Sequence, residues 1–163
     1  MVEHAAHHCR QPLAVIPSAV LGPIARIVLG VDGSTESLEA LNWCTELAKV
    51  TKASAAVVVV KDPDRAFRPR TTPEQWRHDV ECQLDEWVEP LVAAGIVTDR
   101  ILQSDTHPAD GLLGVASASD GDVLVIGTKG AGGIADVRIG GVAMKVLHKA
   151  SLPLVLVPPR PTE

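Results

Sequence analysis

Residues 122–158 read DVLVIGTKGAGGIADVRIGGVAMKVLHKASLPLVLVP, and this stretch decides the fold of the chain. It opens with the apolar run 123–126, which is typical of a buried strand. A glycine-rich loop follows, and then Val142, Val146 and Leu147 recur at helical spacing. The apolar run 154–157, bracketed by prolines, indicates a second buried strand. A strand, glycine loop, helix and strand in this order can hold a phosphate, because glycines admit backbone N–H donors and a helix start favours anions.

The glycine spacing excludes two common phosphate-binding loops. A Walker A loop needs Lys and then Ser or Thr after its second glycine, but Gly132 is followed by Gly133. The dinucleotide fingerprint G-x-G-x-x-G should follow the first strand, where the chain has GVDGS at residues 30–34. The spacing that remains is G-x2-G-x9-G, formed by Gly127, Gly130 and Gly140.

This spacing resembles the nucleotide-binding signature of the universal stress protein family, in which Ser or Thr follows the last glycine. The resemblance extends to IVLGVDGS at residues 27–34 and to VLHKASLPLVLVP at residues 146–158. It covers residues 24–158, and its motifs occur in the family's order. It implies a Rossmann-like fold of the adenine nucleotide alpha hydrolase type, binding of ATP or another adenine nucleotide, and a homodimer through the last strand.

The resemblance also implies a set of ligand contacts. Asp32 would meet the ribose or adenine, although an Asp-Gly-Ser turn also favours aspartate for purely local reasons. At Val60 a backbone group would meet adenine, while its side chain is expected to be core. The implied nucleotide-binding residues are Asp32, Val60, Gly127, Gly130, Gly140, Gly141 and Val142.

Gly141 stands where nucleotide-binding relatives carry a hydroxyl, and Ala143 cannot replace it. A lost hydrogen bond to phosphate removes about 0.5–1.5 kcal/mol of binding, or 1.5–3 kcal/mol if it is charge-assisted. At a helix start, glycine costs only a few tenths of a kcal/mol relative to serine. We therefore expect a stable fold with weak nucleotide binding. Lys129 and Arg138 could supply charge in the loop, or be ordinary solvated surface residues.

The order of the remaining elements predicts an α/β fold. Strands are expected at 27–31, 55–60 and 96–102, with helices after Ser34, from Pro73 to near Gly95, and from Pro108. Leu38, Leu41, Thr45 and Ala48 should face the sheet from the first helix, and the stripe Trp76, Val80, Leu84, Trp87, Val88 and Leu91 from the second. Alternating strands and helices predict an open, twisted, five-stranded parallel sheet with helices on both faces. Ligands bind such sheets at the carboxyl ends of the strands.

Residues 7–17, HHCRQPLAVIP, align without a gap with residues 148–158, HKASLPLVLVP. We therefore interpret residues 1–23 as the remnant of a preceding domain of the same kind and residues 24–160 as a complete one. A chance match between short helix-Pro-strand segments is the alternative. The repeat predicts an extra strand at residues 12–17, paired with a final strand in the same chain or a neighbouring one, and a helical turn at residues 4–9.

Composition narrows the function further. The core must be aliphatic, because the chain has no Tyr, one Phe and three Trp among 163 residues. A net charge of −5 argues against nonspecific binding to nucleic acid or membranes. The N-terminus lacks the pattern of a signal peptide, no apolar run is long enough for a membrane span, and three widely spaced cysteines suit reduced thiols in a cytoplasm.

No catalytic set is visible in the sequence, and no metal site is predicted. A zinc cluster of His4, His7, His8 and Cys9 is the alternative to an ordinary helix end, which is the preferred interpretation. Cys44 and Cys82 are expected to pack within helices. The sequence thus predicts a non-enzymatic stress-response protein with weak adenine-nucleotide binding. A dimeric interaction module with a vestigial nucleotide site is the alternative.

Overall fold

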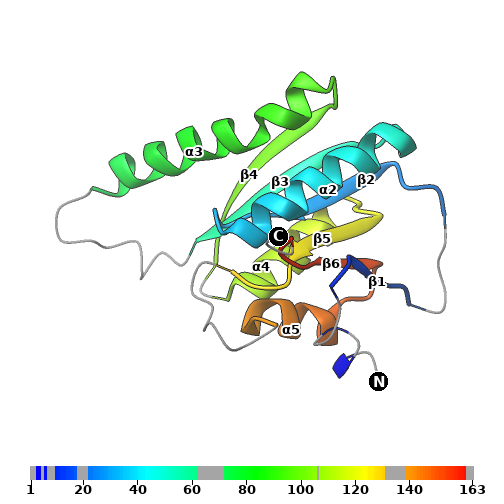
Figure 1. Cartoon of the computed structure of the whole chain (residues 1–163). Helices are drawn as coiled ribbons and strands as arrows, with labels where there is room; N and C mark the ends of the chain where they lie inside the picture. Colours follow the sequence, from blue (N-terminus) through cyan, green and yellow to red (C-terminus); the bar gives the residue numbers. More distant parts are fainter. Residues whose placement is uncertain are drawn as a thin grey trace.

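The structure is a computed structural model, which describes residues 3–4, 6, 10–17, 22–61, 72–105, 107–130 and 139–160. Strands and helices alternate along most of the chain (Figure 1). The strands are β1 (Leu13–Val15), β2 (Arg26–Gly30), β3 (Ser54–Lys61), β4 (Thr98–Ser104), β5 (Val123–Gly127) and β6 (Leu154–Val157). The helices are α2 (Thr35–Thr51), α3 (Pro73–Ala93), α4 (Pro108–Ala118) and α5 (Gly141–Lys149).

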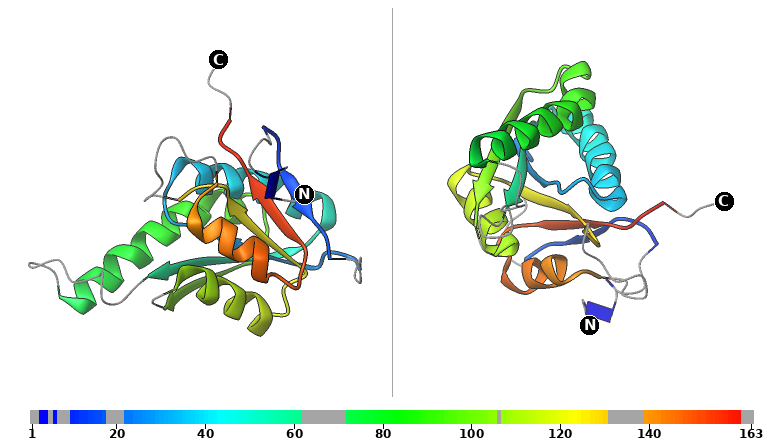
Figure 2. Two further views of the ribbon diagram at one scale, coloured as in Figure 1. Left: turned by 90° about the horizontal axis from the view of Figure 1, so that it is seen from below. Right: turned by 90° about the vertical axis from the view of Figure 1, so that its left-hand side faces the viewer.

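One sheet carries the whole fold, with strand order β1-β6-β5-β2-β3-β4. The five strands from β2 to β6 pair in parallel, and β1 pairs antiparallel with β6. Helices α2 and α3 cover one face of the sheet, and α4 and α5 cover the other (Figures 1 and 2). The predicted five-stranded parallel sheet with helices on both faces is thus confirmed, together with the extra N-terminal strand.

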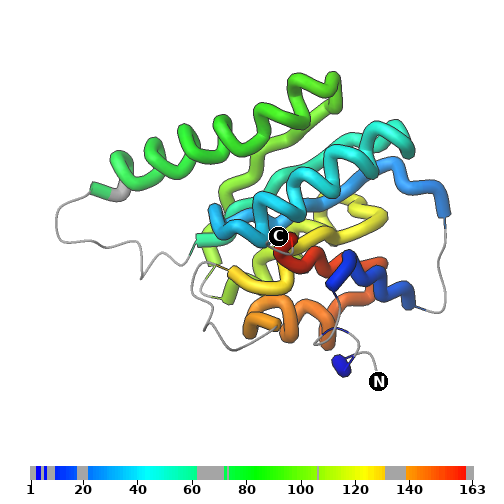
Figure 3. The backbone as a smooth tube through the Cα atoms, viewed as in Figure 1, coloured from blue at the N-terminus to red at the C-terminus, as the bar shows by residue number. Residues whose placement is uncertain are grey.

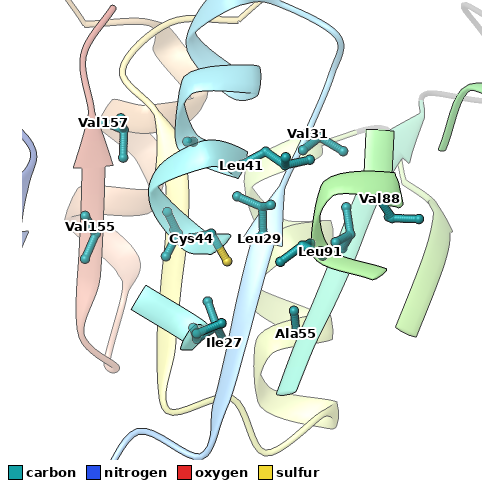
Figure 4. Close-up of a cluster of buried hydrophobic side chains, with 14 of the residues drawn as sticks. Ile27, Leu29, Val31, Leu41, Cys44, Ala55, Val88, Leu91, Val155 and Val157 are labelled. Atoms are coloured by element: carbon teal, nitrogen blue, oxygen red, sulfur yellow. The ribbon is translucent and has the colours of Figure 1, made fainter. Parts of the chain in front are cut away.

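The core consists of two aliphatic layers, one on each face of the sheet. Every residue of β5 and β6 is buried, because helices cover both faces of these central strands. On the α2 and α3 side, Ile27, Leu29 and Val155 pack against Leu41, Cys44, Val88 and Leu91 (Figure 4). Burial raises the pKa of the Cys44 thiol to about 12, so it is a neutral packing residue, as predicted.

Helix α2 packs through three of its four predicted stripe residues, Leu41, Thr45 and Ala48, together with small residues beside them. Its buried positions are Ser37, Ala40, Leu41, Cys44, Thr45 and Ala48. The prediction that Leu38 faces the sheet is wrong, since Leu38 is 37% exposed. Small side chains let the helix approach the sheet closely, and this turns Leu38 to the rim of the contact. In α3 the predicted stripe is confirmed, with Val80, Leu84, Val88 and Leu91 buried and both tryptophans partly buried.

Helix caps explain where the predicted element boundaries shift. Helix α3 begins with a capping box in which Thr72 and Gln75 satisfy each other's backbone N–H groups, followed by Pro73. At its other end the N–H of Ile96 donates to the carbonyl of Leu91 at 3.0 Å, so Ile96 still belongs to the helix end. For this reason β4 covers Thr98–Ser104 rather than the predicted 96–102.

The carboxylate of Asp122 links the amino ends of β2 and β5. Asp122 Oδ2 accepts hydrogen bonds from the backbone N–H groups of Ala25 and Arg26, both at 2.8 Å. Asp122 immediately precedes β5, and Arg26 begins β2, so the pair of bonds supports the alignment of Ile27 with Val123. In the smooth tube of Figure 3, β5 runs beside β2, with which it pairs in parallel.

The N-terminal segment packs on the last strand and last helix. Strand β1 pairs with β6 through Leu13 and Leu156, Ala14 and Val155, and Val15 and Leu154, which confirms the predicted pairing and places it within one chain. Ala6 is 3% exposed and belongs to the core on the α4 and α5 side. Glu3 pairs with His148 of α5 at 3.0 Å. Residues 3, 4 and 6 are helical, while residues 7–9 of the predicted turn lie outside the described residues.

No helix in the described ranges is both long and apolar enough to span a membrane.

Removal of residues 1–18 should lower stability and promote self-association. The deletion strips β1 from β6, so a fully buried aliphatic strand becomes an open edge that invites pairing with other chains. We expect the melting temperature to fall by roughly 2–8 °C, which corresponds to about 1–2 kcal/mol for a domain of this size. Differential scanning calorimetry measures the first effect, and light scattering measures the rise in mass.

A shorter deletion of residues 1–9 is the matched control, because it keeps β1 while it removes the contacts of Glu3 and Ala6. This variant should remain in the oligomeric state of the full chain. Unchanged mass and melting temperature in the longer deletion would show that β1 contributes nothing to stability.

Candidate functional site

A cavity of about 480 Å³ lies where β2, β3 and β5 end, beneath the first turns of α4 and α5. This is the edge at which parallel α/β sheets bind ligands. The cavity brings together all seven residues that the sequence analysis proposed for nucleotide contact, although their role in binding stays a prediction. Its lining includes Asp32, Val60, Gly127, Gly130, Gly140, Gly141 and Val142.

Asp32 organises the turn between β2 and α2. Its Oδ1 accepts hydrogen bonds from the backbone N–H of Ser34 at 3.0 Å and from the Ser34 hydroxyl at 2.6 Å. The oxygen of that hydroxyl in turn accepts the N–H of Ser37 at 3.2 Å, which caps α2. Asp32 therefore holds the helix start in place, and its local turn role and its predicted ligand role are compatible.

Two glycines allow a neighbouring backbone or side chain to approach closely at this edge. A Cβ on Gly127 would lie 2.8 Å from the backbone carbon of Glu36, so glycine lets α2 start directly against the end of β5. A Cβ on Gly130 would collide with Oδ2 of Asp32, so this glycine makes room for the carboxylate. The predicted phosphate-loop glycines thus also have packing roles that hold without any ligand.

Helix α5 presents an open N-terminus to the cavity. The N–H of Gly140 donates to the carbonyl of Thr128 at 2.7 Å, which closes the base of the glycine loop. The N-cap residue Gly140 makes no side-chain cap, so it leaves backbone N–H groups of the first turn open to a ligand. Among the described residues outside its own helix and chain neighbours, none would lie within 4 Å of a Cβ added to Gly141. Such a helix start favours an anion.

Val142 lies at the predicted cavity but not on the buried face of the last helix. The sequence pattern assigns it to the apolar face of the last helix, but it is 39% exposed and lines the cavity. Ala143 and Val146 are the buried residues of α5. Because α5 is only nine residues long and packs through its middle, its first turn projects beyond the core and over the site.

The walls of the cavity are apolar and its rim is mainly basic. Val58, Leu112 and Ile126 belong to the core cluster beneath α4 and α5 and form part of the floor. The charged or titratable residues of the lining are Asp32, His107, Lys129 and Lys145. Beside the cavity, Lys149 pairs with Asp110 at 2.7 Å and holds the pKa of that carboxyl below its usual value. An apolar pocket with a few convergent polar groups is typical of a small-molecule site.

Sequence reasoning missed the contributions of α4 and the middle of α5. His107, which precedes Pro108 at the start of α4, and Lys145 both line the cavity. A signal for Lys145 was present, because it follows Gly141 by four residues and therefore lies on the same helix face. His107 could have been placed from topology, since the loop after β4 must end at the same sheet edge.

Other predicted features fall outside the described residues or are absent from the lining of this cavity. Arg138 and residues 7–9 of the histidine cluster lie outside the described residues. Across the described part of the chain, no group of three or more metal-ligating side chains comes together. A larger hollow of about 710 Å³ lies along the outside of α2, between Trp43, Pro90 and Pro158. Two ion pairs line it, Arg160 with Glu39 and Lys49 with Glu46, and none of the predicted nucleotide-binding residues belongs to its lining.

The fold and the cavity together define a doubly wound α/β protein with a glycine-lined site at the carboxyl edge of its sheet. The chain belongs to the universal stress protein family, whose model matches residues 23–158. It is 30% identical over 148 residues to universal stress protein Rv2319c of Mycobacterium tuberculosis, a match that covers 82% of this chain and 48% of that protein. The chain thus spans about half the length of this relative.

Solved structures share the fold. A universal stress protein in complex with cAMP matches with a TM-score of 0.66 and 22% identity, over 85% of this chain and 99% of that one. The universal stress protein from Archaeoglobus fulgidus in complex with dAMP matches with a TM-score of 0.63 and 23% identity, over 83% of this chain and 99% of that one. At these identities the comparison supports the shared architecture.

Substitution of Asp32 by Ala should destabilise the protein moderately. The change removes the two hydrogen bonds to Ser34 and loosens the cap of α2, which should cost about 1–2 kcal/mol in the free energy of unfolding. Asp32→Asn keeps an acceptor oxygen and should recover at least half of that loss. Urea denaturation of both variants measures the difference. Equal stability of Asp32→Ala and the natural protein would remove the carboxylate from the cap.

Proposed function

We propose that this chain is a non-enzymatic stress-response protein that binds an adenine nucleotide, weakly, in the cavity at the carboxyl edge of the sheet. The observation that carries the proposal is the convergence of Asp32, the glycine loop and the open start of α5 on one apolar-walled cavity. Family membership supports it, as do relatives of the same fold that were solved with cAMP and with dAMP.

Each part of a nucleotide has a suitable partner in the cavity. The adenine ring would lie on the apolar wall near Val58 and Val60, with a backbone group of Val60 as its hydrogen-bond partner. The Asp32 carboxylate would accept hydrogen bonds from the ribose hydroxyls. The phosphates would meet the N–H groups at the start of α5, where the helix dipole is positive.

Weak affinity follows from the chemistry at the start of α5. Gly141 offers no hydroxyl, and the N–H of Gly140 already donates to Thr128. Without the hydroxyl, binding loses about 0.5–1.5 kcal/mol, or roughly threefold to tenfold in affinity. These two observations also favour the second candidate function, an interaction module whose nucleotide site is vestigial.

The proposal extends to the assembly and place of action of the protein. Residues 1–23 would be the remnant of a preceding domain of the same family, which the sequence match between β1 and β6 supports. A homodimer through β6 would require β1 to leave that edge or to be exchanged between chains. A cytoplasmic location is supported by the free thiols of Cys44 and Cys82.

Direct titration with ATP tests the proposed function. The ring of Trp87 lies against Gly33, next to Asp32, so nucleotide binding should change tryptophan fluorescence. We expect saturable binding with a dissociation constant between about 100 µM and 1 mM. In a Trp87→Phe variant, any fluorescence change that remains must come from the other tryptophans. Calorimetry then shows whether this variant still binds ATP. CTP should bind at least several-fold more weakly, and equal binding of CTP and ATP would contradict recognition of adenine.

Substitution of Gly141 by Ser should tighten ATP binding. The new side chain enters free space, and its hydroxyl can donate to a phosphate, so the gain should be about 1 kcal/mol or roughly fivefold in affinity. Gly141→Ala is the matched control, because it adds the same Cβ without the hydroxyl. Calorimetric titration of the three proteins separates the hydrogen bond from the general effect of replacing glycine. An equal gain in the Ala variant would assign the effect to the helix rather than to the hydroxyl.

A further inference from the structure

Lys145 lies one helical turn after Gly141 on α5, and both residues line the cavity. Side chains of an α-helix tilt toward its N-terminus, so each covers the surface over the preceding turn. The Lys145 side chain is therefore directed over Gly141 toward the open helix start. Gly141 leaves this path clear of the other described residues, since none outside its own helix and chain neighbours lies within 4 Å of the place that its Cβ would occupy.

The ammonium group of Lys145 is available to a ligand. In the described ranges, no hydrogen bond or ion pair engages it. The nearby carboxylate of Asp110 forms its hydrogen bond with Lys149 at 2.7 Å, and Lys145 contributes only a smaller coulombic attraction to it. Lys129, the other lysine of the lining, has interactions of its own. Lys145 is thus an exposed cation at the point where the phosphates of a bound nucleotide would lie.

We infer that Lys145 supplies the phosphate contact that Gly141 cannot, and that the site therefore selects adenine nucleotides by the length of their phosphate chain. This inference rests on the proposed function. A hydroxyl forms one short, directional bond, and that bond is much the same for one phosphate or three. An ammonium on a flexible stem instead responds to the total charge within its reach, which grows with each phosphate.

The exchange of a hydroxyl for an ammonium also changes how the site responds to salt. Interactions between exposed charges are screened over about 10 Å at 0.1 M ionic strength, whereas a short hydrogen bond is not. Preference for ATP over AMP should therefore be largest in dilute buffer and shrink as salt is added. The binding of adenosine, which has no phosphate, should not depend on Lys145 at all.

The test compares adenosine, AMP and ATP by calorimetric titration against four proteins, in dilute buffer with EDTA. The proteins are the natural chain, Lys145→Met, Lys145→Arg and Lys49→Met. Methionine keeps the length and helix propensity of the side chain and removes its charge. Lys49 is an exposed lysine on α2 outside the cavity, so its variant controls for the change in net charge.

In Lys145→Met, we expect ATP affinity to fall about fivefold to twentyfold, AMP affinity to fall less, and adenosine affinity to stay unchanged. The Arg variant should keep the preference for ATP, and Lys49→Met should behave like the natural chain. The difference between the natural chain and Lys145→Met should shrink at roughly 0.5 M salt.

Equal ATP affinity in the natural chain and Lys145→Met would overturn the inference and leave the proposed function standing. An equal loss of adenosine and ATP binding would overturn it too, since that pattern indicates a damaged site rather than a lost phosphate contact. If the natural chain binds none of the three compounds, the proposed function fails and this inference fails with it.

Discussion

Close approach of backbones at the carboxyl edge of the sheet is the constraint on which the site depends. Glycine at position 127 lets the backbone of Glu36 lie where a side chain would otherwise stand, so α2 can begin at the end of β5. Gly30 instead leaves room for a side chain of α4, since a Cβ there would lie 2.8 Å from Cδ2 of Leu112. The helix starts are thereby brought around one small volume. The cavity between them follows from these strand ends, whether or not a ligand occupies it.

An aliphatic core on both faces of the sheet holds the helix starts in place around the cavity. Valine, isoleucine and leucine fill both faces of the central strands, and branched side chains suit a pleated surface covered on both sides. Because helices pack on both faces, the polar groups needed for binding can only gather at the strand ends. The stability of the layers and the location of the site therefore have the same origin. The cap formed by Asp32 and Ser34 joins the two, since it stabilises α2 and also shapes the cavity.

Sequence periodicity was sufficient for the architecture, because runs such as 55–60 and 123–126 are long, apolar and separated by clear helix signals. The β1 pairing could be predicted from the repeat with β6. The position of Leu38 could not, since the choice of buried face depends on how closely α2 approaches the sheet. Within the site, motif spacing placed Asp32 and the glycines at one cavity. His107 and Lys145 were missed because no motif marks them, although the position of His107 after β4 and the spacing of Lys145 from Gly141 place both at this edge.

The two edges of the sheet are protected by different means, and this difference bears on assembly. At the β4 edge, Arg26 pairs with Asp99 at 2.6 Å and Arg100 pairs with Asp85, so charged side chains discourage another strand from pairing there.

Strand β6, near the other edge, carries only Leu and Val, so it has no charged side chain that would discourage pairing. It depends on β1, a pairing of three residues in which Leu13 and Val15 are only partly buried. Such a short pairing buries little area, and the entropy of ordering the segment opposes it. The apolar strand β6 is therefore covered by β1, which is the shortest strand in the described sheet. Any association of this protein with a second chain through the sheet should take place at β6, by replacement or exchange of β1, rather than at β4.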